Sequence, residues 1–149
     1  MDTFGDLALG FSVALTWSNL SYCFLGVLIG TLIGVLPGIG PAATMALLLP
    51  STYYLNQTSA FIMLSGVYYG AMYGGSTTSI LVNIPGEAAS IVTCLDGHQM
   101  ALRGRAGVAL GISAFGSLIG GTVSIVGLMF FTAPLAKLAL LFGPPEYFA

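Results

Sequence analysis

Long apolar runs alternate along this chain with short interruptions that are polar or rich in glycine and proline. The main apolar runs cover residues 20–36, 59–73 and 107–131, and residues 132–142 add a shorter piece beginning near Pro134. A helix needs about 20 mainly apolar residues to cross a bilayer. The pattern therefore predicts an all-α, polytopic membrane protein forming a single membrane domain over residues 1–149, with helical spans over 106–149.

Charge is almost absent from these runs. Of 149 residues, 56% are hydrophobic and 5% are charged, whereas soluble domains carry about 25% charged residues. No charged residue occurs between positions 7 and 86 or between 106 and 136. A water-soluble globule is thereby excluded. The sequence has no basic patch, which argues against a nucleic-acid partner.

Glycine recurs every four residues within the predicted spans. In lipid, close backbone contact at small residues drives helix association, so we expect these glycines to fix neighbouring helices. The four-residue series are Gly26, Gly30, Gly34 and Gly38, and then Gly66, Gly70 and Gly74; the last span is lined less regularly by Gly107, Gly111, Gly116, Gly120 and Gly121.

Residues 1–17 mix apolar and acidic positions and are predicted to form an interfacial helix. Trp17 would anchor it at the membrane surface, where tryptophan and tyrosine collect. The lipid bilayer is therefore the first partner that the sequence predicts.

The hexapeptide LPGIGP interrupts the first span. It holds four helix breakers, Pro37, Gly38, Gly40 and Pro41. Unwound backbone at membrane depth survives only inside protein or beside a water-filled cavity. Residues 41–49 would then form a half-helix whose amide end, with about half a positive charge, suits an anion. The alternative is a plain turn at the membrane surface.

A second interruption, GAMYGGSTTSILVNIPGE, covers residues 70–87. Flexible backbone, hydroxyl groups and one amide meet here at Gly74, Gly75, Ser76, Thr77, Thr78, Asn83 and Pro85. We interpret residues 20–87 as a broken-helix region whose two interruptions form part of a solute or ion site. The alternative is that the hydroxyl groups bond back to their own helix and merely bend it.

Residues 88–105 carry the main cluster of charge and are predicted to form a cytoplasmic loop, because arginine and lysine favour that side. A short helix over 88–95 would stop at Gly97. His98 is either a proton carrier or a solvated loop residue. If residues 41–54 cross the membrane as a half-helix, the N-terminus lies outside the cytoplasm; if they re-enter and return, the orientation reverses.

Motifs for covalent chemistry are absent. The sequence has no GxxxxGK[ST] phosphate loop and no GxSxG nucleophile elbow. One histidine and no Cys/His cluster leave no zinc site, and Ser76 has no evident base. We therefore predict transport rather than an enzyme, and no cofactor beyond a coupling ion.

Several stretches together resemble one family, the large membrane subunit of the tripartite tricarboxylate transporters. They are GTLIGVLPGIGPAATMALLLP, YYGAMYGGSTTSILVNIPGE, LDGHQMALRGRAG, ALGISAFGSLIGGT and FGPPEYFA, in that order over nearly the whole chain. The resemblance implies a multi-pass permease of the bacterial inner (plasma) membrane. It also implies a small membrane subunit, a periplasmic solute-binding protein, a carboxylate substrate, and uptake driven by a sodium or proton gradient.

For a carboxylate, the expected ligands are backbone amides near Gly38 and Gly40, with oxygens from Ser76, Thr77, Thr78 and Asn83 around the solute. A coupling sodium ion is expected at Ser76, Thr77 and Asn83. Members of the family are several-fold longer, so this chain matches their opening part. The alternative function is a truncated fragment that does not transport and only packs with other membrane subunits.

Overall fold

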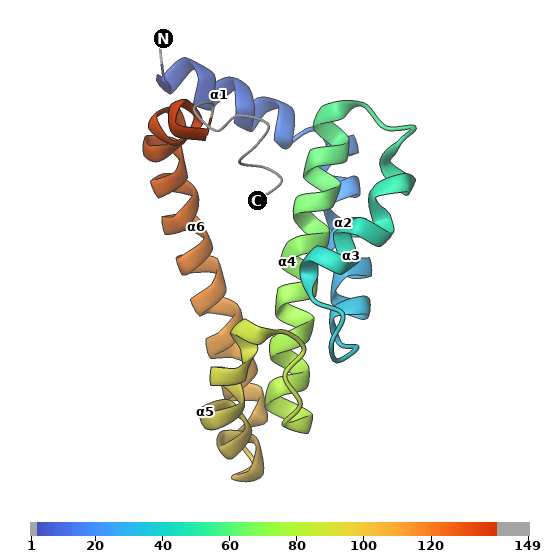
Figure 1. The fold of residues 1–149 in the computed structure, drawn as a ribbon, viewed down its shortest axis with the longest axis vertical. Coiled ribbons are helices and arrows are strands. Elements are labelled where there is room, and N and C mark those ends of the chain that lie inside the picture. Colours follow the sequence, from blue (N-terminus) through green and yellow to red (C-terminus); the bar gives the residue numbers. More distant parts are fainter. Residues whose placement is uncertain (1–2, 140–149) are drawn as a thin grey trace. The chain divides into compact units, whose positions relative to one another are not determined.

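In a computed structural model of the chain, residues 3–139 are described. They contain helices and no strand, which confirms the all-α prediction. The chain divides into residues 1–113 and 114–149, and the last helix crosses this division. The helices are α1 (Thr3–Ala14), α2 (Trp17–Gly34), α3 (Pro41–Leu48), the 3₁₀ helix η1 (Leu49–Thr52), α4 (Gln57–Val82), the 3₁₀ helix η2 (Ala88–Ser90), α5 (Ile91–Leu102) and α6 (Ala106–Ala139) (Figure 1).

Within residues 3–139, two helices are long and apolar enough to cross a membrane: α2, and α6 over Ala106–Thr132. Both were predicted as spans. The predicted helix within residues 1–17 is present as α1, but Trp17 begins α2 instead of ending α1. The prediction that a separate apolar piece begins near Pro134 is wrong for the residues up to Ala139, because α6 continues through that proline. Membrane helices tolerate an internal proline when the freed backbone group finds another partner; residues 140–142 lie outside the described part.

Helices α2 and α4 lie side by side and contact each other through glycine (Figure 1). A Cβ atom added at Gly30 would come 2.8 Å from the Cα of Val67, and one added at Gly66 would come 2.7 Å from the Cys23 oxygen. Both separations are shorter than side chains adopt. The glycines of each helix therefore receive the backbone of the other, as the four-residue spacing predicted.

The register of this interface makes α2 and α4 parallel. Gly26, Gly30 and Gly34 meet Met63, Val67 and Ala71 in that order. Both helices therefore begin at the same end, and residues 35–56 return the chain over the length of α2. Helices α3 and η1, with 8 and 4 residues, supply about 20 Å of this return at their usual rises.

Polar side chains join the beginnings of α2 and α4. The buried Ser59 hydroxyl donates to the Asn19 side-chain oxygen at 2.6 Å, and the Asn19 amide donates to the Val13 carbonyl at 2.8 Å. Asn56 caps α4 by accepting from the Ser59 backbone N–H at 2.8 Å. Such bonds satisfy polar groups that would otherwise be costly to bury.

The predicted break at residues 74–79 is wrong, because α4 continues through it to Val82. The alternative holds there: hydroxyl groups bond back to carbonyls one turn earlier. Thr77 donates to Tyr73 at 2.9 Å, and Ser79 donates to Gly75 at 2.9 Å. The interruption of helix comes later, over residues 83–87.

The segment predicted as a loop over residues 88–105 is mostly helical. It contains η2 and α5, and α5 passes through Gly97, where a stop was predicted. Gly97 is buried because α5 packs there on α4: an added Cβ would lie 2.8 Å from the Ile80 side chain. The turn comes after Leu102, at Gly104, whose φ of 74° suits glycine.

Candidate functional site

Two proline–glycine segments, distant in sequence, meet beside α4. The first follows α2 and contains Gly38; the second follows α4 and contains Gly86. The Gly38 N–H donates to the Gly86 carbonyl at 3.3 Å. Gly86 is also buried against Gly75, and a Cβ added to it would overlap the Gly75 Cα. The site therefore requires glycine at the point where the second segment crosses α4.

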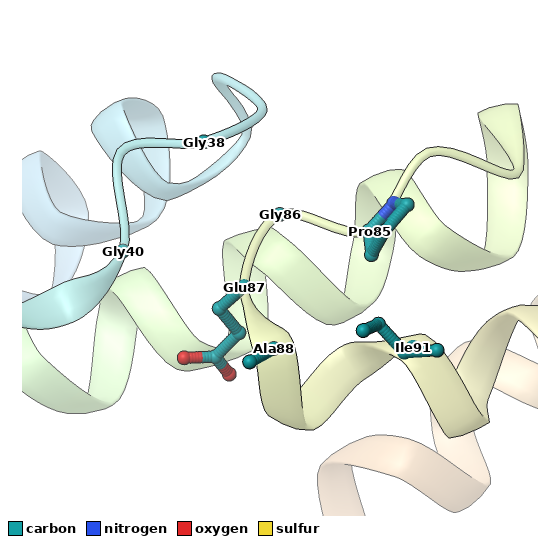
Figure 2. A pocket seen from close by; sticks show the side chains of 7 residues that line it. All are labelled: Gly38, Gly40, Pro85, Gly86, Glu87, Ala88 and Ile91. Atoms are coloured by element: carbon teal, nitrogen blue, oxygen red, sulfur yellow. The ribbon is translucent and has the colours of Figure 1, made fainter.

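A pocket of about 410 Å³ lies between the two segments (Figure 2). Its wall is mostly backbone and small apolar side chains. Figure 2 shows Gly38 and Gly40 on one segment, with Glu87 on the other. The lining residues are Gly38, Gly40, Pro85, Gly86, Glu87, Ala88 and Ile91.

The first segment is built as the sequence predicted. Helix α2 ends at Gly34, Gly38 adopts a φ of 88°, and α3 begins with Pro41 in its first turn. The Thr44 N–H makes the first bond of α3, to the Gly40 carbonyl at 3.1 Å. The LPGIGP break is confirmed, and Gly40, the N-cap of α3, faces the pocket.

Of the two glycine amides expected to hold an anion, one is already engaged. The Gly38 N–H is bonded to Gly86, whereas the Gly40 N–H has no acceptor within residues 3–139. The amides of Ala42 and Ala43 precede the first intrahelical bond of α3 and belong to exposed residues. The donors available to an anion therefore gather at the start of α3.

The second segment reverses the chain at the end of α4. Asn83 takes the left-handed conformation, with a φ of 61°, and ends the helix. The chain then runs back along α4, so that Gly86 reaches Gly75. Ser90 holds the start of the next turn, since its hydroxyl donates to the Glu87 carbonyl at 2.9 Å.

Among the residues that line this pocket, Glu87 is the one with an ionisable side chain. Its Cβ lies 4.0 Å from the position of an added Cβ at Gly40, and its Cγ lies 3.7 Å from that at Gly75. Glu87 lies outside both candidate spans. Its partial burial disfavours the charged form and raises the pKa of the carboxyl above its usual value.

The histidine predicted as a proton carrier or a solvated residue has a structural contact. The Nδ1 atom of His98 lies 3.0 Å from the Ile80 carbonyl oxygen. Because α4 ends at Val82, that carbonyl belongs to the last turn, where helical N–H donors run out. His98 therefore caps α4 from α5 and helps to hold the two helices together.

The structure brings together only part of the predicted site. Gly38, Gly40 and Pro85 line the pocket, Gly75 packs against the lining residues Gly86 and Glu87, and Pro37 and Pro41 belong to the first segment. Ser76, Thr77, Thr78 and Asn83 do not line it, and Gly74 packs against Thr31 and Gly34.

Sequence reasoning missed Gly86, Glu87, Ala88 and Ile91 as pocket residues. One signal was present: LPG at residues 36–38 and IPG at residues 84–86 repeat an apolar–proline–glycine triplet. Nothing in the sequence marks Ala88 or Ile91, since their position depends on how η2 and α5 fold back.

These features define an α-helical membrane protein with a small pocket between two interruptions of its helices. The chain belongs to the tripartite tricarboxylate transporter TctA family, which matches residues 20–149. It is also 58% identical over 149 residues to a protein of Agrobacterium vitis described as "Uncharacterized 52.8 kDa protein in TAR-I ttuC' 3'region". The match covers 100% of this chain and 30% of that relative's length. No solved structure matches the chain.

Proposed function

We propose that the chain forms part of a permease that takes up tricarboxylates or related carboxylates across a bacterial inner membrane, coupled to an ion gradient. The observation that carries this proposal is the pocket where the segments of Gly38 and Gly86 meet. The membership of a transporter family supports it.

The pocket suits one end of a carboxylate. Gly40 lines the pocket and its N–H has no acceptor within residues 3–139, and the N-terminal end of a helix carries partial positive charge. Glycine at positions 38 and 40 leaves this backbone uncovered by side chains. The substrate carboxylate would lie against Gly40, with Pro85 and Ile91 forming the apolar side of the pocket.

The parallel α2 and α4 favour one of the two predicted orientations. With 26 residues, α4 is about 39 Å long, which exceeds a hydrocarbon core of about 30 Å, but its composition is more polar than that of the candidate spans α2 and α6. If α2 and α4 both span, residues 35–56 cross back between them. Arg103 and Arg105 follow α5, which packs against the last turns of α4. This end would therefore be cytoplasmic, and the N-terminus would lie outside, with α1 at the interface.

A substitution at Gly40 tests the pocket. Gly40→Val would fill the space beside Glu87 and cover the N-cap of α3, so uptake of labelled citrate by cells expressing the whole natural protein should be lost. Gly10→Val is the control, because nothing lies within 4 Å of an added Cβ there. Equal amounts of both variants in the membrane fraction, with normal uptake by Gly40→Val, would refute the site.

The transporter would work with the small membrane subunit and the periplasmic solute-binding protein that its family name implies. A flux assay on these 149 residues in proteoliposomes separates this proposal from a non-transporting fragment that only packs with other subunits. Saturable citrate flux without added subunits would exclude the alternative that the chain is a non-transporting fragment. We propose no enzymatic role: the Ser76 hydroxyl donates to the Met72 carbonyl at 3.2 Å, within its own helix.

A further inference from the structure

The pocket proposed for a carboxylate contains an acid and no compensating base. Its other lining residues are glycine, proline, alanine and isoleucine. Arg103 and Arg105 are exposed beyond the end of α5. An anion entering this pocket therefore meets a second carboxyl group, and like charges at a shared site disfavour the doubly ionised state.

We propose that Glu87 takes up one proton from water whenever the substrate carboxylate binds, so that proton uptake and anion binding are coupled at this residue. The step breaks no covalent bond of the substrate. The proton adds to a carboxylate oxygen of Glu87, neutralises it, and returns to water when the anion leaves. This inference rests on the proposed function and names the coupling ion and the residue that carries it.

The surroundings of Glu87 favour a proton over a sodium ion. Hard cations require several oxygen ligands, and Glu87 is the pocket residue whose side chain offers oxygen. Burial also raises the Glu87 pKa, which makes the neutral form easier to reach.

The other titratable groups on the neighbouring elements do not line the pocket. On the elements around Glu87 they are Tyr22 and Cys23 of α2, Tyr68, Tyr69 and Tyr73 of α4, and Cys94, Asp96 and His98 of α5. His98 is engaged with the Ile80 carbonyl, and Asp96 is exposed. Glu87 is thus the group whose charge a bound anion would change most.

The test measures proton uptake and citrate affinity on the purified whole natural protein. A pH-indicator dye in weak buffer counts protons taken up per citrate bound, at a pH where free citrate is fully ionised. We expect about one proton for the wild type, and an affinity that falls about tenfold per pH unit once Glu87 ionises in the free protein. Glu87→Gln should bind citrate with no proton uptake and little pH dependence.

Two variants serve as controls. Asp96→Asn removes an exposed acid outside the pocket and should behave as wild type. Glu87→Asp retains a carboxyl group, so it should still take up a proton even if Glu87→Gln fails to fold. The same titration in sodium and in choline salts shows whether sodium replaces the proton.

Citrate binding by the wild type without proton uptake, or unchanged proton uptake in folded Glu87→Gln, would overturn this inference alone. A sodium requirement in place of proton uptake would do the same. No citrate binding by the wild type at any pH would overturn the proposed function of the pocket as well.

Discussion

Gly86 lies directly against Gly75, with their backbones in contact where the second proline–glycine segment crosses α4. The carbonyl of the same Gly86 accepts a hydrogen bond from the Gly38 N–H. The backbone of Gly86 therefore connects both interruptions to the C-terminal part of α4. Its lack of a side chain lets the pocket form close to α4.

Gly86→Ala should displace the second segment from α4 and widen the gap to Gly38. Overpacking of this kind costs about 1–3 kcal/mol, and we expect citrate uptake to be lost. Thermal unfolding in detergent and uptake in cells measure the two effects. Gly107→Ala, where an added Cβ meets nothing within 4 Å, should leave uptake unchanged and should not lower the melting temperature, because alanine is the better helix former. A wild-type melting temperature for Gly86→Ala would contradict the observed contact.

Gly30→Ala tests the parallel helix pair. An added Cβ would press on the backbone of Val67, which cannot rotate away as a side chain can. We expect destabilisation of about 2 kcal/mol or more. Gly10→Ala is matched in chemistry but open in space, so its higher helix propensity should stabilise α1 by up to about 1 kcal/mol. Unfolding of the two variants in the same detergent measures both changes in stability, which should have opposite signs. Changes of the same sign would refute the interface.

Thr78 and Thr77 form a matched pair for testing hydroxyl groups in α4. The buried Thr78 hydroxyl lies 2.9 Å from the Val35 carbonyl, in the segment that follows α2. Thr77 bonds only within its own helix. Thr78→Val should therefore lower the unfolding free energy by about 1 kcal/mol, whereas Thr77→Val should change it little. If Thr77→Val alone abolishes sodium-dependent uptake, Thr77 is a ligand as the sequence predicted.

The helix breaks and the glycine interfaces were predictable to different degrees. LPGIGP could be read directly, because two prolines and two glycines exclude a continuous helix. The spacing of Gly26, Gly30 and Gly34 predicted a packing face. It could not predict which helix fills that face, or that α2 and α4 are parallel, since both depend on the path of residues 35–56.

The polar stretch over residues 74–79 misled the prediction for a physical reason. Hydroxyl groups near glycine are compatible with a break, but they are equally satisfied by carbonyls one turn earlier. The competition is decided by burial against the end of α2, just beyond which the Val35 carbonyl accepts a hydrogen bond from Thr78. Glu87 ends the wider stretch over residues 70–87 and was not predicted to line the site, because its return to Gly75 depends on the left-handed Asn83.

Asn83 allows the last prediction to separate a ligand from a backbone role. Its φ of 61° disfavours most side chains but suits glycine. Asn83→Gly keeps the turn and removes the amide, whereas Asn83→Leu disturbs both, at a cost of about 1–3 kcal/mol for the strained backbone.

If the turn alone matters, Asn83→Gly should transport citrate at the wild-type rate and only Asn83→Leu should fail. If the amide binds the solute or sodium, both variants should lose uptake, and Asn83→Gly should do so with an unchanged melting temperature. Uptake in cells with a membrane-fraction immunoblot decides between them. Because Asn83 does not line the pocket, we expect the first outcome.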